Sequence, residues 1–437
     1  MNTNEKSKSA LSRRKFLGHA ALLAGSFSII PRHVLGGKGY VAASDRINLG
    51  FIGTGRQGVT LQRYFTGTGE EQIIAACDIY KHKLDNFVKI TDAFYTERYG
   101  GAKSYKSCIP YHDFRDLLNN KDIDAVVIAT PDHWHAAMAV RAAAAGKDIY
   151  CEKPLSLTIE EGRAMVDATR KYERVFQTGS MQRSWPEFIQ TAEIIRNGYL
   201  GEIRGINVIL GNPPIVYNLP EEPVPAGLDW DFWLGPNEYL HYNHELNPVL
   251  NDPLWARWRD FKGLGGGDMT DWGGHMFDIV QWSLDMDHAG PVEIIPPDGK
   301  EYKLLTYRYE NGVTMTHETV GNKRAIEYIG TEGTLEVQRR KLVTTPAALA
   351  TRKIGADEKQ VYRSSDHYKD FFQAMRNRSK PVADVEIGHR SATVCNLGNI
   401  AYELGRSLRW DYKNEHFKND AEANRMRGRK MKKEWKV

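Results

Sequence analysis

The sequence is short of cysteine, of net charge and of long apolar runs. Its four cysteines form no Cys-x-x-Cys pair and no cysteine–histidine cluster with zinc spacing; they are Cys77, Cys108, Cys151 and Cys395. Buried thiols are therefore expected, rather than a disulfide framework or a zinc site. The formal charge of +4 is too small to indicate a nucleic-acid partner. The mildly apolar run Ala20–Ile30 is too short for a stable membrane span.

What is present is typical of a globular protein with more than one domain. Hydrophobic residues make up 41% and charged residues 26% of 437 residues, a length that predicts two or three domains. In 45–180, strand-like and helical segments alternate; the strand candidates are 46–52, 72–77, 124–129, 148–151 and 175–178. This alternation predicts a Rossmann-type α/β domain with a doubly wound parallel sheet.

The pattern changes over 181–412. A helical segment is followed by strand candidates at 205–210, 292–295, 302–309, 313–319, 325–330 and 334–337. Short turns such as Asn311-Gly312 predict an α+β domain with a large, mostly antiparallel open sheet. Helices at 366–377 and 388–404 are expected to pack back against the domains. The basic segment 413–437 is predicted to be a solvated tail.

A Pro- and Trp-rich segment, 212–261, interrupts the second domain. Loops of this length usually have a role, so we expect it to shape a pocket. The alternative is a surface excursion with a small apolar cluster of its own.

A glycine-rich turn follows the first strand and precedes a helical segment: Gly53-Thr54-Gly55-Arg56-Gln57-Gly58. In a dinucleotide-binding turn, Gly53 allows the tight bend, Gly55 lets the backbone approach a pyrophosphate, and Gly58 permits close helix–strand packing. The helix N-terminus attracts phosphate, and Arg56 can add a positive charge. The whole turn is predicted to bind the cofactor.

Asp78 ends the second strand, 20 positions after Gly58. A carboxylate there accepts hydrogen bonds from a ribose 2′-hydroxyl and repels a 2′-phosphate, which favours NAD over NADP. The third strand ends at Thr130 and Pro131, which are predicted to line the cofactor's path. His133 and His135 either contact ribose or cap the following helix.

Two further segments carry groups suited to proton transfer. Strand 148–151 runs into Glu152-Lys153-Pro154, where the proline keeps the lysine backbone extended. An ammonium beside a hydroxyl stabilises a developing alkoxide, although a lone lysine is more often a solvated charge. Asp271 and His275 are four apart, so in a helix they share one face. They form either a proton-transfer pair or a structural hydrogen-bonded pair. A third alternative is a metal site completed by Asp278 or a loop histidine, but neither is a convincing third ligand, so we predict no metal.

The three motifs resemble, in order and spacing, those of the glucose–fructose oxidoreductase / inositol dehydrogenase / MocA (Gfo/Idh/MocA) family. The resemblance implies that Lys153 lies beside the nicotinamide, that His275 transfers a proton, and that Asp271 stands next to it. It also assigns Glu152 and Gln182 to the cofactor. Dimers or tetramers formed through the second sheet are implied as well.

Substrate contacts are expected from the domain junction and from the long loop. The candidates are Arg183, Tyr217, Trp258 and Arg259, with His244 as a weaker one. Aromatic side chains in this loop suit stacking on a sugar face.

Three functions are compatible with these residues. The first is an NAD-dependent oxidoreductase acting on a sugar or glycoside hydroxyl, for example at C3, with NAD either released or retained and recycled. The second is a glycoside hydrolase that uses NAD transiently; that branch of the family departs from Glu-Lys-Pro, whereas Lys153 is present here. The third is a non-catalytic sugar sensor.

Residues 1–44 resemble a twin-arginine export signal followed by a linker. Arg13-Arg14-Lys15-Phe16-Leu17 precedes the apolar run, and small residues follow at 41–44. This predicts a periplasmic or otherwise exported protein that folds around its cofactor before transport. An uncleaved anchor and an ordinary basic extension are the alternatives.

Overall fold

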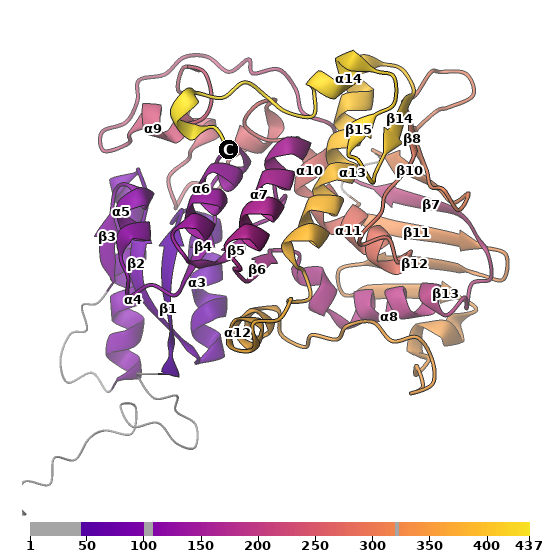
Figure 1. Ribbon diagram of the computed structural model, residues 1–437, viewed down its shortest axis with the longest axis horizontal. Helices are drawn as coiled ribbons and strands as arrows, with labels where there is room; N and C mark the ends of the chain where they lie inside the picture. The colour runs from indigo at the N-terminus through magenta and orange to yellow at the C-terminus, as the bar shows by residue number, and fades with distance from the viewer. Residues whose placement is uncertain (1–44, 100–107, 320–322) are drawn as a thin grey trace, which may run out of the picture. The chain divides into compact units, whose positions relative to one another are not determined.

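The computed structural model describes residues 45–99, 108–319 and 323–437; the predicted export signal lies outside these residues. From Ile47 onward the chain forms one compact unit built on two β-sheets. Figure 1 shows the first sheet with its helices beside the second, larger sheet. No helix within the described ranges is long and apolar enough to cross a membrane.

The first sheet is parallel throughout, with strand order β3-β2-β1-β4-β5-β6. Its strands are β1 (Ile47–Ile52), β2 (Glu71–Cys77), β3 (Ile109–Tyr111), β4 (Ala125–Ile128), β5 (Asp148–Cys151) and β6 (Phe176–Thr178). The connecting helices are α3 (Arg56–Thr68), α4 (Lys81–Arg98), α5 (Phe114–Asn119), α6 (Asp132–Ala144) and α7 (Ile159–Lys171). The order reverses between β1 and β4, and ligands bind at such a switch point, outside the carboxyl ends of the strands.

Both faces of this sheet are buried, as the continuous apolar strands predict. Successive residues of β1 point to opposite faces: Phe51 packs in one core cluster and Ile52 in the other. Helix α12 (His367–Asn377), although near the C-terminus, packs on α3 of this domain, and its Phe371 and Phe372 join the same core as Phe51.

The second sheet has nine strands in the order β13-β12-β11-β7-β10-β9-β8-β14-β15. They are β7 (Ile203–Ile209), β8 (Glu293–Ile295), β9 (Leu305–Arg308), β10 (Thr314–Glu318), β11 (Ala325–Gly330), β12 (Thr334–Gln338), β13 (Lys341–Thr345), β14 (Leu408–Asp411) and β15 (His416–Phe417). Within this second sheet, β7 and β10 are the only pair of described strands that run parallel. The mostly antiparallel sheet predicted for 181–412 is confirmed, and Asn311-Gly312 forms the β9–β10 turn, with Gly312 at φ 85°.

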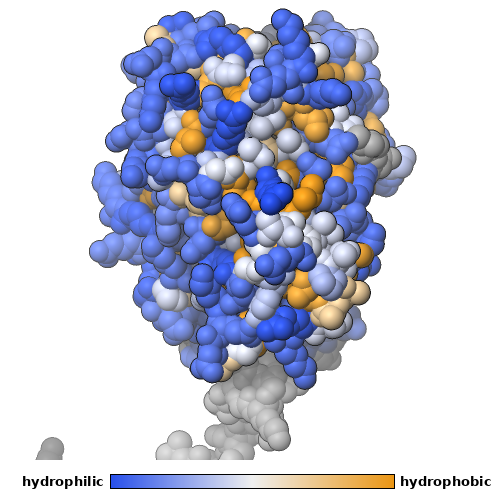
Figure 2. Space-filling model, turned by 90° about the vertical axis from the view of Figure 1, so that its right-hand side faces the viewer, coloured by the Kyte–Doolittle hydropathy of each residue, from blue (hydrophilic) through white to orange (hydrophobic). Residues whose placement is uncertain are grey.

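Helices cover one face of the second sheet. They are α8 (Pro186–Arg196), α10 (Asp268–Asp271), α11 (Gly273–Ser283) and α13 (Val385–Leu404), and their apolar residues share a core with the strands. Helix α13 also contacts α7 of the first domain, so it packs back as expected. Figure 2, viewed from the side of the second sheet, shows hydrophobic residues in small groups among hydrophilic ones.

The long segment 212–261 both lines a cavity and forms a small apolar cluster of its own. It contains α9 (Trp230–Leu234) and has its own apolar cluster, which includes Trp233, Leu246 and Phe261. It also joins the first domain, because Lys81 N donates to Gly227 O at 3.0 Å.

The prediction of a solvated basic tail over 413–437 is wrong. The segment forms β15 and α14 (Ala421–Arg425) and then returns to the first domain. There Arg429 pairs with Glu161 at 2.8 Å, and Trp435 is buried in the apolar core. The Trp435 ring lies 4.8 Å from that of Trp134. Its basic residues meet carboxylates on the domain surface, a complementarity that the sequence pattern of the tail alone does not reveal.

Trp435→Ala is expected to lower the free energy of unfolding by about 3 kcal/mol, because the truncation leaves a cavity in the first domain's core. Denaturant unfolding of the purified protein measures this change. Lys436→Ala, at an exposed neighbouring position, is the control and should leave stability unchanged. Equal stability of both variants would show that the tail does not contribute to the core.

Candidate active site

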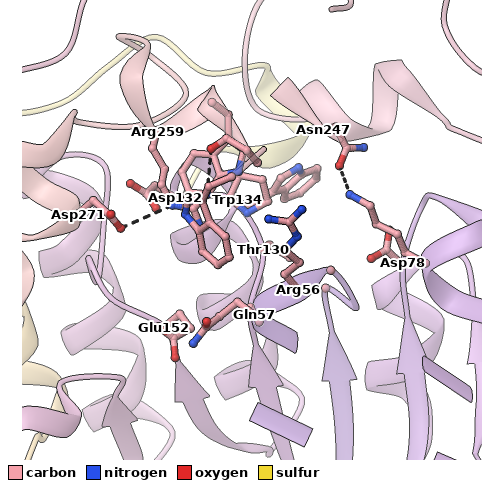
Figure 3. A pocket seen from close by; sticks show the side chains of 18 of the residues that line it. Arg56, Gln57, Asp78, Thr130, Asp132, Trp134, Glu152, Asn247, Arg259 and Asp271 are labelled. Carbon is pink, nitrogen blue, oxygen red and sulfur yellow. Dashed lines mark hydrogen bonds and ion pairs between the residues drawn. The ribbon is translucent and has the colours of Figure 1, made fainter. Parts of the chain in front are cut away.

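A cavity of about 660 Å³ opens at the carboxyl ends of the first sheet and is closed by the second domain. Figure 3 shows its two ends. Asp271 and Arg259 mark what we call the reaction end, Asp78 and Asn247 mark the nucleotide end, and Asp132 and Trp134 lie between them.

The glycine turn has three glycines with different constraints. Gly53 has φ 91°, and a Cβ there would lie 2.7 Å from the Ala129 carbonyl. At Gly58 a Cβ would meet Gly53 O at 2.2 Å, so helix α3 packs too closely for a side chain. At Gly55, with φ −67°, a Cβ would meet nothing within 4 Å. The packing of the protein therefore leaves the backbone at Gly55, the N-cap of α3, open to the close approach of a ligand.

Asp78 anchors the turn and faces the cavity. Its Oδ2 accepts hydrogen bonds from Thr54 N at 2.8 Å and Thr54 Oγ1 at 2.9 Å, and its Oδ1 accepts one from Tyr80 N at 2.9 Å. Asp78 lines the cavity, whereas Thr54 is fully buried behind it. Thr54 therefore orients Asp78 rather than lining the cavity itself.

Segment 247–256 covers the nucleotide end. Arg56 donates to Leu250 O and to Pro253 O, both at 3.4 Å, and its guanidinium lies 5.8 Å from the Trp255 ring. Lys83 Nζ donates to Asn247 Oδ1, and burial lowers the pKa of Lys83 to about 8. Arg56 is thus held by the long loop as well as by the turn.

Lys153 and Asp271 form the central contact of the reaction end. Lys153 Nζ donates to Asp271 Oδ1 at 2.7 Å and to the Asp271 carbonyl at 3.0 Å. Burial by itself raises the pKa of Asp271, but the charges of Lys153 and Arg259 outweigh it and hold that pKa below its usual range. The pair joins the end of β5 to helix α10.

His275 lies close by, in the first turn of α11, and lines the same cavity. Burial lowers its pKa well below the usual value, and the charges of Lys153 and Arg339 lower it further. Its Nδ1 is buried and has no hydrogen-bond partner among the described residues. The imidazole is therefore neutral near pH 7 and able to accept a proton.

The expected helical pairing of Asp271 with His275 is not what the structure shows. Helix α10 ends at Asp271 and α11 begins at Gly273. Within the described parts of the chain, the Asp271 carboxylate pairs with Lys153 and, at 3.6 Å, with Arg259. At the end of α10, both the carbonyl and the carboxylate of Asp271 accept hydrogen bonds from Lys153 of the first domain.

Two buried carboxyl groups complete this region. Burial raises the pKa of Asp132 to about 8, although the charge of Arg259 opposes the shift. Burial also raises the pKa of Glu152, against the charge of Lys153 and a hydrogen bond with Gln57. Glu152 Oε1 has no partner in the described structure. Gln57, Glu152, Thr130 and Pro131 all line the cavity, as predicted for cofactor contacts.

Several predicted contact residues lie behind the cavity wall. The ring nitrogens of His133 contact Leu264 O and Trp233 O, and those of His135 contact Pro154 O and Thr130 O, so both histidines hold backbone segments together. Gln182 Oε1 accepts from Arg339 Nε at 3.0 Å and is buried. These three residues position the wall.

Two substrate-contact predictions are corrected. Arg183 is fully buried and pairs with Asp278 at 2.8 Å and Asp287 at 2.7 Å. These two carboxylates neutralise its charge inside the second domain. The Tyr217 hydroxyl donates to His241 O, and the ring packs on Phe261 in the loop's own cluster. Neither lines the cavity.

Trp258 and Arg259 line the reaction end as predicted, with the guanidinium 4.1 Å from the Trp258 ring. His244 is instead exposed and paired with Glu222 at 2.9 Å.

Sequence reasoning missed a group of lining residues that come from separate elements. They are Lys83, Asp132, Trp134, Asn247, Trp255, Trp272 and Arg339. Asp132 directly follows the Thr130-Pro131 pair at a strand end, which is a usable signal. For Arg339, in the β12–β13 turn, no sequence pattern indicates that the side chain lines a cavity.

The donor set fits a dinucleotide better than a metal. The described residues contain no group of three or more His, Cys, Asp or Glu side chains able to hold a metal ion. The open approach at Gly55, the N-terminus of α3 and the orphaned Glu152 oxygen suit a bound nicotinamide dinucleotide.

Comparison with known proteins supports this fit. Residues 47–180 match the family described as "Oxidoreductase family, NAD-binding Rossmann fold", and residues 215–437 match "Oxidoreductase family, C-terminal alpha/beta domain". The uncharacterized oxidoreductase YrbE of Bacillus subtilis is 24% identical over 380 residues, which is 84% of this chain and 93% of YrbE.

Two other proteins are similar to parts or most of the chain. A glycosyl hydrolase family 109 protein of Shewanella pealeana is 29% identical over 207 residues, and the match covers 44% of each chain. The WlbA dehydrogenase from Bordetella pertussis, crystallised in complex with NADH and UDP-GlcNAcA, has a TM-score of 0.57 at 17% identity, covering 84% of this chain and 99% of that one. This structural likeness shows a shared fold.

Gly55→Ala is expected to leave thermal stability unchanged and to weaken NAD binding at least roughly tenfold, since a methyl group would occupy the space of the pyrophosphate. Gly58→Ala should instead lower stability, because its Cβ would clash with Gly53 O. Thermal unfolding without cofactor and calorimetric titration with NAD separate the two effects. A destabilised Gly55→Ala variant would contradict the assignment.

Asp132→Asn should become more stable relative to the wild type as pH rises. The folded state keeps the Asp132 proton up to about pH 8, whereas the unfolded chain releases it near pH 4. The stability that this carboxyl contributes is therefore lost between those values, and asparagine has no proton to lose. Denaturant unfolding from pH 5 to 8.5 measures the difference. A difference independent of pH would show an ordinary pKa at Asp132.

Proposed function

Because the chain belongs to the Gfo/Idh/MocA oxidoreductase family, we propose that it is an NAD-dependent oxidoreductase acting on a hydroxyl of a sugar or glycoside. The observation that carries the proposal is the Lys153 ammonium, fixed on Asp271 beside a neutral His275 at the reaction end of the cavity.

The chain's own residues would hold the cofactor along the cavity. The glycine turn and the N-terminus of α3 face the pyrophosphate, and Asp78 accepts from a ribose hydroxyl, which favours NAD over NADP. When bound, the nicotinamide supplies the acceptor for the hydride that leaves the carbinol carbon.

Proton handling then falls to two side chains. Oxidation of a carbinol to a ketone releases the hydroxyl proton as the hydride leaves. The Lys153 Nζ stabilises the developing alkoxide oxygen, because it is held in place by two acceptors and is still 15% exposed to the cavity. His275, which is neutral and has a buried Nδ1 without a hydrogen-bond partner among the described residues, accepts the proton.

The aromatic wall supports a sugar as the substrate class. Trp258 and Trp272 line the cavity with Arg259 and Arg339, and Trp255 lies between the two ends, near both Arg56 and Arg259. Indole faces stack on the C–H faces of sugar rings. The bound UDP-GlcNAcA named for the similar WlbA structure agrees with this choice. Export through the twin-arginine-like segment and assembly into dimers or tetramers stay predictions.

A second candidate is glycoside hydrolysis through transient oxidation. It is favoured by the match to a glycosyl hydrolase family 109 protein over 44% of the chain. NAD first oxidises a hydroxyl to a ketone, which acidifies the neighbouring C–H bond, and loss of that proton expels the aglycone. Water then adds, and the NADH reduces the ketone again, so NAD is not consumed. The intact Glu152-Lys153-Pro154, from which we expect that branch to depart, places this candidate second.

The deciding experiment follows NADH absorbance and aglycone release together, with free sugars, p-nitrophenyl glycosides and a disaccharide as substrates. NADH formation or a keto product without aglycone release supports the oxidoreductase. Aglycone release without net NADH supports the hydrolase instead. Absence of both, with NAD bound, would favour a sugar sensor.

Lys153→Met should lower kcat/KM roughly a hundredfold or more, because the alkoxide loses its stabilising charge. NAD affinity should change by no more than a few-fold, since Lys153 lies at the reaction end. Kinetics with the best sugar of the panel and fluorescence titration with NADH measure the two quantities. Lys413→Met, at an exposed site, is the control. Near-normal turnover by Lys153→Met would overturn the role of this ammonium.

A further inference from the structure

Arg339 is a cation at the reaction end that the proposed chemistry does not use. It sits in the turn between β12 and β13 and lines the cavity together with His275 and Trp272. The positive charge of Arg339 acts on Asp271 and His275 and lowers the pKa of both. Among the described residues, no carboxylate lies within salt-bridge distance of it, whereas Lys153 and Arg259 both face Asp271.

The Arg339 guanidinium is held rigidly. Its faces lie 4.6 Å from the Trp272 ring and 5.3 Å from the Trp185 ring. Its Nε donates to Gln182 Oε1 at 3.0 Å. Stacking on the faces and one bond at Nε leave the edge formed by the two Nη groups, the edge that binds planar carboxylates in a bidentate manner.

The charges at the reaction end do not balance without a ligand. Asp271 is shared by Lys153 and Arg259, and Asp268 pairs with Arg324 at 2.7 Å. Asp132, whose pKa is raised to about 8 by burial, is protonated at neutral pH. Lys153, Arg259 and Arg339 thus face a single ionised carboxylate at this end, so the reaction end is net positive and favours a negatively charged group on the ligand.

We propose that the substrate is a sugar acid or its glycoside, and that the Arg339 guanidinium binds its carboxylate. The inference rests on the proposed oxidoreductase function and narrows its substrate class. A carboxylate suits Arg339 because its planar pair of oxygens matches the two N–H groups of the free Nη edge. Arg339 determines specificity here and takes no part in proton transfer.

The test compares methyl β-D-glucuronide with methyl β-D-glucoside, which differ only in the carboxylate. Calorimetric titration of the NAD-loaded protein should show tighter binding of the glucuronide. Arg339→Gln should weaken glucuronide binding roughly tenfold to a hundredfold, the usual range for a lost charged hydrogen bond, and leave glucoside binding and NAD affinity within threefold. Arg340→Gln, at the exposed neighbour in the same turn, is the matched control and should change neither sugar.

Each outcome has a definite meaning. Equal binding of the two sugars by the wild type, binding of neither, or an equal loss of both in Arg339→Gln would overturn the inference. A loss of NAD affinity in Arg339→Gln would assign this cation to the cofactor and overturn it as well. Oxidation of neutral sugars without a glucuronide preference would leave the oxidoreductase function standing. Glucuronide binding through Arg339 without any oxidation would support the inference and reject that function.

Discussion

The ion pair between Lys153 and Asp271 is the contact on which the site depends, because it joins the two domains where the chemistry would occur. Lys153 follows β5 of the first sheet, and Asp271 ends α10 of the second domain. Their side chains are 15% and 18% exposed, so the pair is shielded enough to be strong and open enough to meet a ligand. The ammonium is oriented before any substrate arrives, which is how a preorganised charge stabilises a transition state without reorganisation. Removing either partner would leave the other charge poorly compensated.

A second ion cluster sets the position of the helix that carries His275. Arg183 stands just after the first sheet, and its guanidinium holds Asp278 of α11 and Asp287 beyond that helix. The side chains of Arg183 and Asp278 are each 1% exposed, so the geometry of this cluster is fixed by close packing. Asp278 is three residues from His275 in the same helix. A residue expected to contact substrate therefore lies one layer deeper, where it holds the helix that carries His275 against the domain junction.

Local sequence patterns predicted the parts of the site that local structure determines. The glycine turn, Asp78 and Lys153 each follow a buried strand, and a strand end fixes where the next side chain points. Arg339 and Trp435 could not be found in this way, because their roles depend on partners far away in the chain, such as Gln182 and Trp134. The Asp271–His275 spacing misled for a related reason. Four residues predict a shared face only in an unbroken helix, and tertiary packing divides this one at Trp272.

The segment 212–261 contributes residues to both ends of the cavity. At the nucleotide end it supplies Asn247, which bonds to Lys83, and the carbonyl groups that bind Arg56. At the reaction end the same segment supplies Trp258 and Arg259, which stack on each other beside Asp271. A ligand at either end of the cavity would therefore contact the same loop. The strand ends hold Asp78 and Lys153 in place, and this one loop contributes to the cavity wall at both ends.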